Sequence, residues 1–437
     1  MNTIDNCLAA LGVGIPEILL PRDGIDLSKW AVIACDQFTQ DREYWERVKN
    51  IAAGAPSCIN LIFPEVYLEG ASDELRGKRI LDIRDSMNAY SKGNVFAPPR
   101  RCCVYLERST PHNPKRRGLV LLVDLERYEW APQSRPLIRS TEGTVTERLP
   151  SRIQIRRGAP LELPHILLLI DDEQDELIPA LGKIARTRPP LYETPLMMNS
   201  GAVSGWAVDT RDAWTLLADG LQTLAEKSGG ESPFLFAVGD GNHSLASAKA
   251  VWEEYKKSHA GDAALENHPA RWALVEVENL YDPGISFQPI HRIVFGESGG
   301  AWRRELVQAL AALPDIQCHV DDVGAAADGS GGNLVIRIES RLPDIATASI
   351  QPLLDRFVSE NGFSIDYIHG EEETVRLASD PARAAAGIIL PPVRKDGFFK
   401  TIAQNGPLPR KSFSMGEAEE KRFYLECRAL FGELAVG

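Results

Sequence analysis

The sequence is poor in cysteine, and none of its cysteines has the spacing of a metal site. Its seven cysteines form no C-x-x-C pair, and Cys102 and Cys103 are adjacent within an apolar strand pattern. Structural zinc sites need paired ligands at such short spacings. An odd number of thiols without a pairing pattern is typical of a reducing compartment. The sequence therefore predicts reduced, mostly buried thiols in a cytoplasmic protein.

Long apolar runs are also missing. Runs such as "HILLLI" and "LVLLV" have the length of a strand, whereas a membrane-spanning helix needs about 20 apolar residues. The amino-terminal segment carries Asp5 and no basic residue near Met1, which is unlike a secretory signal. We therefore expect no membrane partner.

Positive charge is in deficit. The chain has 48 Lys and Arg residues against 61 Asp and Glu residues, for a net charge of -13. Nucleic acids and anionic membranes repel a net anion, and basic residues interleaved with aromatic ones are absent. We expect no nucleic-acid partner, and a homodimer is left open. The G-x-x-x-x-G-K-[ST] phosphate loop and the H-E-x-x-H zinc motif are missing as well.

What is present is a mixture of strand and helix patterns over 437 residues, which predicts a mixed α/β fold. "RCCVYLER" and "GLVLLVDLERYEW" resemble a hairpin, and "RIQIRRG" and "HILLLIDD" resemble further strands. "DAWTLLADGLQTLAEKSGG" has helical spacing and a Gly-Gly stop. The glycine-rich "GESGG" suggests a boundary between an amino-terminal α/β domain, residues 1–298, and a smaller carboxy-terminal α/β domain, residues 299–437.

One turn concentrates polar residues between a strand and a helix. "FAVGDGNHSLASAK" predicts a strand over residues 234–238 and a helix over residues 244–257, whose apolar stripe would pack on the sheet. Asp240 could hold Mg²⁺ or accept a proton, and His243 could carry a proton or contact a phosphoryl oxygen. Gly241, Asn242 and Ser244 would bring backbone and polar groups to an anion at the helix start. Alternatively, Asp240 and Asn242 only cap the helix.

Other stretches could complete a site for a phosphorylated or polar small molecule. One is the hydroxyl-rich loop "IRSTEGTVTERLPSRIQIRRG", and a second is "SFQPIHRIVFG" at the start of a strand. A third is the basic loop "PLPRKSFSMGEAEEKRFY" of the carboxy-terminal domain, which leads into a helix expected from about Glu417. Each of them could equally be an ordinary surface loop or a structural pair, and "LMMNSGAVSGW" is interpreted as a strand end and turn that serve packing. The candidate residues in these stretches are Arg139, Thr141, Glu142, Thr144, His291, Arg292, Arg410 and Lys411.

These stretches together resemble a known family. "WAVIACDQFTQDREYW", "LIFPEVYLE", "LMMNSG", "FAVGDGNHSLASAK", "IDYIHGEEE" and "PLPRKSFSMGEAEEKRFYLECR" are similar to the family named domain of unknown function one-zero-one-five, from about Trp30 to Arg428. Relatives carry Asp-Gly-His-His-Arg in the central turn. That signature resembles the ParB/sulfiredoxin-like fold, which includes free-serine kinases, and it implies such a core and a role in serine metabolism. Asp240, Gly241 and His243 match it, whereas Asn242 and Ser244 replace the first His and the Arg.

The resemblance implies a phosphotransferase that acts on a small, serine-like hydroxyl substrate with a nucleotide, ATP or ADP, and Mg²⁺. In this hypothesis Asp240 or Glu142 deprotonates the hydroxyl or holds the metal, and His243 stabilises the transferred group. Another arginine would replace the one missing at Ser244. Two alternatives stay open: a phosphatase of a phosphorylated small molecule at the same turn, and a binding protein without catalysis.

Overall fold

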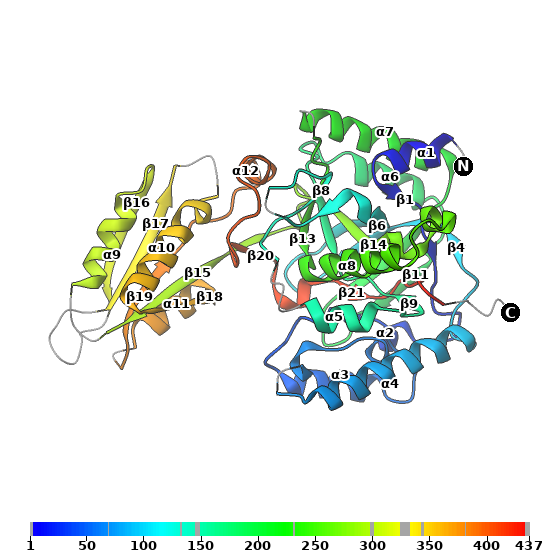
Figure 1. Cartoon of the computed structure of the whole chain (residues 1–437), viewed down its shortest axis with the longest axis horizontal. Coiled ribbons are helices and arrows are strands. Elements are labelled where there is room, and N and C mark those ends of the chain that lie inside the picture. Colours follow the sequence, from blue (N-terminus) through cyan, green and yellow to red (C-terminus); the bar gives the residue numbers. More distant parts are fainter. Residues whose placement is uncertain are drawn as a thin grey trace. The chain divides into compact units, whose positions relative to one another are not determined.

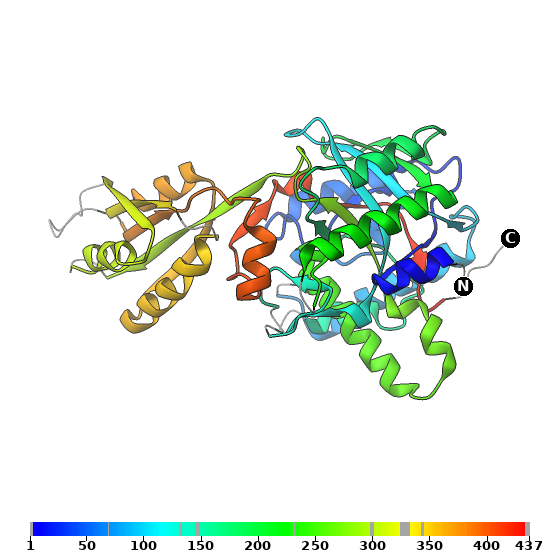
Figure 2. The same ribbon diagram turned by 90° about the horizontal axis from the view of Figure 1, so that it is seen from above.

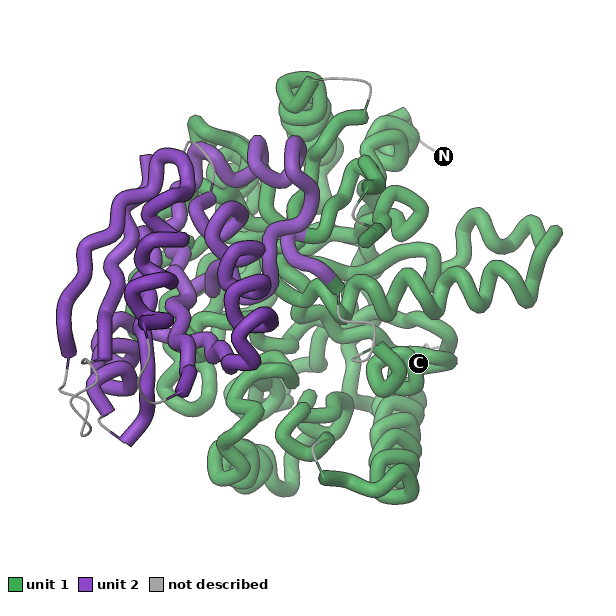
Figure 3. The backbone as a smooth tube through the Cα atoms, turned by 60° about the vertical axis from the view of Figure 1, so that its left-hand side comes forward, with its two compact units in different colours: residues 1–140, 144–285, 417–437 green, residues 141–143, 286–416 purple. Residues whose placement is uncertain are grey.

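The computed structural model contains two compact units (Figure 3). Unit 1 comprises residues 1–140, 144–285 and 417–437, and unit 2 comprises residues 141–143 and 286–416. The structure describes residues 3–68, 70–131, 133–144, 149–229, 232–297, 301–323, 333–341, 345–380 and 382–432.

Unit 1 is built on a mixed sheet in the order β11-β12-β5-β6-β14-β10-β13-β8-β7, with β1 paired to β6 (Figure 1). Neighbouring strands along β11-β12-β5-β6-β14 are antiparallel to one another. Beyond them, β10 is parallel to β14, and β13 is antiparallel to β10 and parallel to β8. The strand bounds are β1 Val13–Gly14, β5 Cys103–Ser109, β6 Arg116–Asp124, β7 Tyr128–Glu129, β8 Ile138–Ser140, β10 Leu167–Ile170, β11 Tyr192–Pro195, β12 Ala202–Val208, β13 Phe236–Asp240 and β14 Trp272–Asn279.

Three short strand pairs join distant parts of unit 1. One pair joins two segments of the amino-terminal region, and the other two join the carboxy-terminal tail to the segments around residues 32 and 161. The pairs are β2 Glu17–Ile18 with β4 Arg100–Arg101, β3 Val32–Ile33 with β21 Phe423–Tyr424, and β9 Leu161–Glu162 with β22 Arg428–Ala429.

Helices and the tail cover both faces of the unit 1 sheet. Alternate side chains of one strand enter different cores: Tyr105 belongs to the core with α1, α6, α7 and α8, and Val104 to the core with α2, α3, α4 and the tail. This explains why the central strands are continuous apolar runs. The helix bounds are α1 Thr3–Ala10, α2 Leu27–Trp30, α3 Arg42–Ala52, α4 Asp73–Lys92, α5 Leu149–Arg156, α6 Leu177–Ala185, α7 Arg211–Ser228 and α8 Asn242–Ser258.

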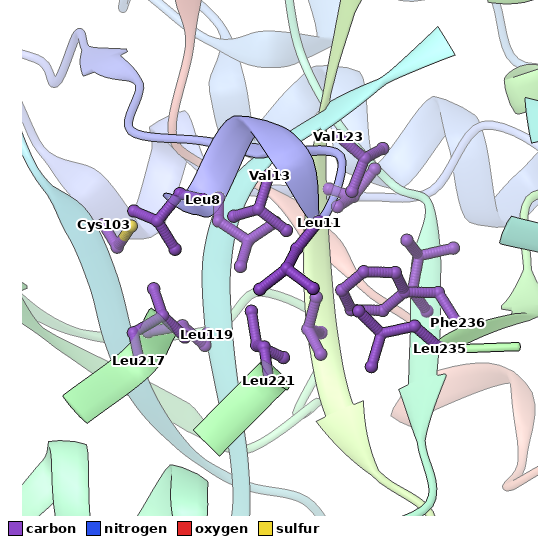
Figure 4. Packing of buried hydrophobic residues seen from close by; sticks show 14 of the residues in the cluster. Leu8, Leu11, Val13, Cys103, Leu119, Val123, Leu217, Leu221, Leu235 and Phe236 are labelled. Atoms are coloured by element: carbon purple, nitrogen blue, oxygen red, sulfur yellow. The ribbon is translucent and has the colours of Figure 1, made fainter. Parts of the chain in front are cut away.

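Figure 4 shows part of the first core, where α1 and α7 meet the sheet. Leu8 of α1 and Leu11, just after that helix, lie near Leu217 and Leu221 of α7, and Phe236 of β13 belongs to the same cluster. Leu245, Ala248 and Trp252 of α8 are buried in this core too, as the apolar stripe predicts. The core thus fixes β13 and α8, and with them the turn that joins the two.

Unit 2 has a smaller sheet in the order β16-β17-β19-β15-β18, with β20 paired to β15 (Figure 1, Figure 2). Val294 packs in a core with α9 and α10, and its neighbour Ile293 packs in another with α11, so helices cover both faces. The bounds are β15 Phe287–Gly296, β16 Ile316–Val323, β17 Asn333–Ser340, β18 Ser364–His369, β19 Ala384–Ile389, β20 Phe413–Met415, α9 Trp302–Ala311, α10 Thr347–Asn361, α11 Glu371–Ala378 and α12 Phe398–Asn405.

The mixed α/β class is confirmed, and so are the β5–β6 hairpin, strand β10 and helix α7. Two local predictions are wrong. "RIQIRRG" belongs to α5 rather than a strand, and Pro150 in the first turn of that helix suits a helix start. The helix expected from Glu417 is a single 3-10 turn, Ala418–Glu420, followed by β21.

The boundary between the two units does not lie between residues 298 and 299, where the glycine-rich stretch suggests it. The main segment of unit 2 begins at Ser286, because β15 pairs with β18 and β19, and the tail after residue 416 returns to unit 1. Buried ion pairs hold this tail: Arg422 pairs with Glu276 of β14 and, at 2.6 Å, with Glu426. A glycine-rich stretch cannot reveal such a return, because the pairing residues are distant in sequence.

Candidate functional site

The predicted polar turn coincides with the junction of β13 and α8, since Asp240 ends the strand and Asn242 begins the helix, but no side chain caps that helix. Gly241 is the N-cap residue, its φ is 79°, and no side chain makes the capping hydrogen bond. A Cβ at Gly241 would lie 3.0 Å from Cα of Ile166, so the turn requires glycine for its conformation and its space. Among the described contacts, Oδ1 of Asp240 accepts one hydrogen bond, which the N–H of the next residue, Gly241, donates at 2.9 Å. The capping alternative therefore does not account for Asp240.

Antiparallel pairing brings His165 to this turn. Leu167, the first residue of β10, is the register partner of Asp240, the last residue of β13. The register shifts between Leu167 and Leu168, so the start of β10 is irregular. His165, just before β10, thus lies beside the end of β13, and its imidazole Nε2 is 2.9 Å from Ser244 Oγ of α8.

A second antiparallel pair adds Asp36 and Lys421. In β3 and β21, Val32 is the register partner of Tyr424, and Ala34 N donates to Arg422 O at 2.9 Å. The residues after β3 therefore lie beside those before β21. Asp36 Oδ2 is 3.7 Å from His165 Nε2, and Lys421 Nζ is 3.3 Å from Asp240 Oδ2.

Tyr424 completes this arrangement, which we call the polar cluster. Its hydroxyl lies 2.7 Å from His165 Nδ1 and donates to Cys35 Sγ at 3.2 Å. Both ring nitrogens of His165 are thus engaged, one toward Tyr424 and the other toward Ser244 and Asp36. The polar cluster consists of Asp36, His165, Asp240, Ser244, Lys421 and Tyr424.

Burial sets the protonation states in the cluster. Burial lowers the pKa of His165, and the carboxylates of Asp36 and Asp240 offset this only in part. Burial acts to raise the pKa of Asp36, but His165 and Arg152 outweigh it and hold that pKa below its usual value. At neutral pH the site therefore contains a neutral imidazole beside an ionised carboxylate. Burial raises the pKa of Cys35 to about 11, so this thiol is protonated and is no nucleophile.

A cavity of about 130 Å³ opens at the cluster, within unit 1. His165, Ser244 and Tyr424 form its polar end, together with the ion pair that Arg152 makes with Glu65. Much of the remaining wall is apolar, and it includes Leu61, Ile62, Phe63, Leu68, Met87, Ile155 and Leu163. A cavity of this kind suits a small molecule with an apolar body and a polar end.

The predicted residues of unit 1 have different surroundings. Ser244 and Ser247 of α8 line the cavity, whereas Asp240 and His243 are not part of its wall. Asn242 accepts a hydrogen bond from Ser140 Oγ at 2.7 Å, because β8 ends beside β13. The joint orientation of Asp240 and His243 toward one cavity therefore stays a prediction.

Arg139 is buried and engaged by the protein itself. Its guanidinium donates to Pro136 O at 2.9 Å and Ser232 O at 3.0 Å, and it lies over the Phe234 ring. Thr144 is half-buried. The positive charge that the sequence lacks at Ser244 is instead supplied near Asp240 by Lys421.

The remaining predicted residues, Thr141, Glu142, His291, Arg292, Arg410 and Lys411, belong to unit 2. His291 and Arg292 are neighbours in β15 and so point to opposite faces. His291 Nδ1 accepts from Leu390 N at 3.1 Å, and Arg292 Nε donates to Gln351 at 2.9 Å. Burial lowers the pKa of Arg292 to about 10, and the charges of Tyr367 and Glu142 oppose this. Arg410 and Lys411 are exposed. Their roles at a site stay predictions.

Sequence reasoning missed Asp36, His165, Lys421 and Tyr424. All four lie in stretches already noted, "WAVIACDQF", "LPHILLLI" and "EKRFYLECR". Polar residues flanking short apolar strands are the signal that could have found them. That signal is weak, because the pairing of β3 with β21 brings together opposite ends of the chain.

The residues that the structure describes do not form a metal site made by protein alone. Within the described ranges, no group of three or more His, Cys, Asp or Glu side chains is arranged around a common point. Asp240 already faces the ammonium of Lys421. We therefore derive no step through Mg²⁺. Separately, each helix in the described part of the chain is too short or too polar to cross a lipid bilayer.

Comparison with known proteins assigns the chain to a family. No curated protein matches the chain. A conserved hypothetical protein from Pyrococcus furiosus aligns with TM-score 0.32 and 10% identity over 71% of this chain and 94% of its own. A free serine kinase in complex with AMP aligns with TM-score 0.33 and 10% identity over 72% and 93%. At these TM-scores the likeness supports no inference about function. The family described as "Protein of unknown function (DUF1015)" matches residues 19–403, and the chain belongs to that family.

Proposed function

We propose that unit 1 is a phosphotransferase that moves a phosphoryl group from a nucleotide, ATP or ADP, to the hydroxyl of a small molecule. The observation that carries this proposal is the pair of Asp240 and Lys421, 3.3 Å apart at the start of α8. A carboxylate can accept the hydroxyl proton, and an ammonium beside it can neutralise the charge of the transferred group. The amino terminus of the helix adds favourable electrostatics for an anion.

The proposed step transfers the phosphoryl group from the nucleotide to the substrate hydroxyl. The substrate hydroxyl oxygen forms a bond to phosphorus, its proton passes to Asp240, and the bond from phosphorus to the nucleotide's leaving oxygen breaks. In this proposal Lys421 contacts an oxygen of the transferred phosphoryl group. Asp36 and Tyr424 hold His165, which in turn positions Ser244 at the polar end of the cavity.

The cavity supports a particular kind of acceptor. Its polar end suits a hydroxyl and a carboxylate, and Arg152 and Arg156 are cations of its lining. In this proposal the acceptor hydroxyl reaches past Ser244 to Asp240, which is not itself part of the wall. The apolar side chains, such as Phe63 and Met87, favour a substrate with hydrocarbon next to its hydroxyl. Among hydroxy amino acids, we therefore expect threonine and larger β-hydroxy acids to be better acceptors than serine.

The test is a turnover assay with ATP or ADP, Mg²⁺ and a panel of hydroxy acids that includes serine, threonine and β-hydroxyvaline, followed by mass spectrometry of the products. We expect a phosphorylated hydroxy acid that appears only with the nucleotide. Asp240→Asn should abolish the product with little change in Tm. Asp212→Asn, the same change at an exposed position of α7, is the matched control and should retain activity.

Two results would contradict the proposal. Release of phosphate from the phosphorylated acids without nucleotide would indicate a phosphatase. Stabilisation by a hydroxy acid with no product under any condition would indicate a binding protein.

A further inference from the structure

Unit 1 contains a second, larger hollow, an open groove of about 710 Å³. Three segments distant in sequence form it: α3 with the turn before it, the turn between β11 and β12, and the tail before β21. The lining of this groove includes Phe38, Tyr44, Arg47, Ile51, Met198, Asn199 and Glu419. None of them belongs to the polar cluster.

The backbone of this groove is strained at three positions. Phe38, Met198 and Asn199 have φ values of 50°, 59° and 58°. Among the described residues, six that are not glycine have positive φ, and these are three of them. This conformation is unfavourable for Phe and Met in particular. Strained residues gather where a ligand is held, because the surrounding fold must maintain them.

An aromatic pair forms one wall. The rings of Phe38 and Tyr44 are stacked, with centroids 3.8 Å apart and planes inclined by 14°. Tyr44 is only 4% exposed, whereas Phe38 is half-buried. Tyr44 thus covers one face of the Phe38 ring, and part of the ring stays open to the groove. Ile51 adds an apolar surface that is 38% exposed.

A buried polar atom at the groove lacks a partner. The hydroxyl of Tyr44 is buried and forms no hydrogen bond with any residue that the structure describes. Such an atom is costly unless something satisfies it. Burial, and then the negative charge of Glu419, raise the pKa of Tyr44, so the hydroxyl keeps its proton and can donate.

The groove is adjacent to the polar cluster through the chain itself. Phe38 follows Asp36 by two residues, and Glu419 precedes Lys421 by two. Two residues of extended chain span at most about 7 Å. The groove therefore lies within a few residues of Asp36 and Lys421 along the chain, a distance shorter than a nucleotide.

We propose that this groove binds the heterocyclic base of the nucleotide donor. The base stacks on the open part of the Phe38 ring, and the amide of Asn199 bonds to its edge. The ribose and phosphates lead toward Lys421, past Arg47. A flat ring with polar edges matches an aromatic wall beside amide groups better than an aliphatic ligand does. This inference rests on the proposed function for the identity of its ligand.

The test measures binding of free nucleosides, which have no phosphate and so probe the groove alone. Adenosine, guanosine, cytidine and uridine are each titrated by calorimetry against the full chain. We expect at least one to bind. Phe38→Leu should weaken that binding about tenfold or more, because it removes the stacking ring.

Asn199→Gly provides the sharper comparison. It removes the amide and relieves the left-handed backbone, so we expect weaker nucleoside binding, about tenfold, with Tm unchanged or raised. Asp315→Gly is the matched control: Asp315 is an exposed unit 2 residue with φ of 56°. It should leave the nucleoside Kd unchanged.

The outcomes separate this inference from the proposed function. If a nucleoside binds with these variant effects but no acceptor is phosphorylated, the result supports base binding in the groove and contradicts the phosphotransferase proposal. If Asp240→Asn abolishes turnover while the folded Phe38→Leu and Asn199→Gly variants keep the wild-type KM for the nucleotide, the groove assignment is overturned. Binding of no nucleoside also overturns it.

Discussion

The ammonium of Lys421 lies 3.3 Å from the carboxylate of Asp240, although the two residues come from different parts of the chain. Asp240 ends strand β13, and Lys421 precedes strand β21 in the carboxy-terminal tail. Their side chains are largely buried, with 11% and 22% exposed. The pair therefore differs from exposed ion pairs such as Lys227 with Glu173.

Lys421→Met should lower kcat/KM for phosphoryl transfer roughly 100-fold, because it removes a cation from the developing phosphoryl charge. Lys421→Arg should restore part of the rate. Steady-state kinetics with the best acceptor measure both. Lys227→Met is the control, since Lys227 also pairs at 3.3 Å, with Glu173, but with both side chains about half exposed. An equal loss in the two Met variants would rule out a special role for Lys421.

The stability of the protein should depend on pH through His165. Its pKa is lowered in the folded state, so the unfolded chain binds a proton more readily. The free energy of unfolding that neutral His165 contributes is fully present above the pKa of His in the unfolded chain, about 6.5. It is lost as the pH falls below that value toward the lower pKa of His165 in the folded protein.

We therefore expect the Tm of the wild-type protein to fall more steeply from pH 7 to pH 5 than that of His165→Gln. Thermal unfolding followed by circular dichroism at half-unit steps measures the two slopes. Parallel curves would show that His165 titrates normally in the folded protein.

Glu278 should produce the opposite trend at higher pH. Burial raises its pKa to about 8, the charge of Glu276 adds to this, and Arg116 opposes it. The folded protein thus holds a proton that the unfolded chain releases near pH 4.3. This contribution is present at low pH and is lost as pH rises toward 8. Glu278→Gln should therefore gain Tm relative to wild type between pH 6 and pH 9. A constant difference over that range would contradict the raised pKa.

Gly241 should be intolerant of a side chain for two reasons. Its φ is +79°, and a Cβ there would approach the backbone of Ile166. Gly54 has a similar φ of +74° but no atom within 4 Å of such a Cβ. Gly54→Ala should cost about 1–2 kcal/mol of unfolding free energy, from conformation alone. Gly241→Ala should cost more, because the contact is added. Urea unfolding compares the two, and equal losses would show that the turn relaxes freely.

The positions of the main elements followed from local patterns. The apolar stripe of α8, the hairpin of β5 and β6, and the turn containing Asp240 are encoded by neighbouring residues, so a single sequence suffices to predict them. The failure at α5 is also local. Ile153 and Ile155 alternate as in a strand, but the helix that contains them packs near α8, and such tertiary packing overrides the alternation.

The residues of the candidate site also fall into those that local sequence predicts and those that long-range pairing brings together. Asp240, Gly241 and Ser244 share one turn and were visible in the sequence. His165 reaches them only because β10 runs antiparallel to β13, and Lys421 only because β21 pairs with β3. Nothing in the residues around His165 or Lys421 specifies those partners, since strand pairing depends on the burial of whole faces of the sheet.

The sequence by itself thus determined the alternation of strands and helices, the glycine-dependent turn and the carboxylate at its start, because short-range sterics and periodicity decide these. Only the tertiary structure decided which charge faces that carboxylate, which imidazole contacts Ser244, and that Phe38 and Tyr44 stack beside Asn199. These arrangements arise from long-range pairing and packing, where buried charges must find partners and apolar faces must be covered.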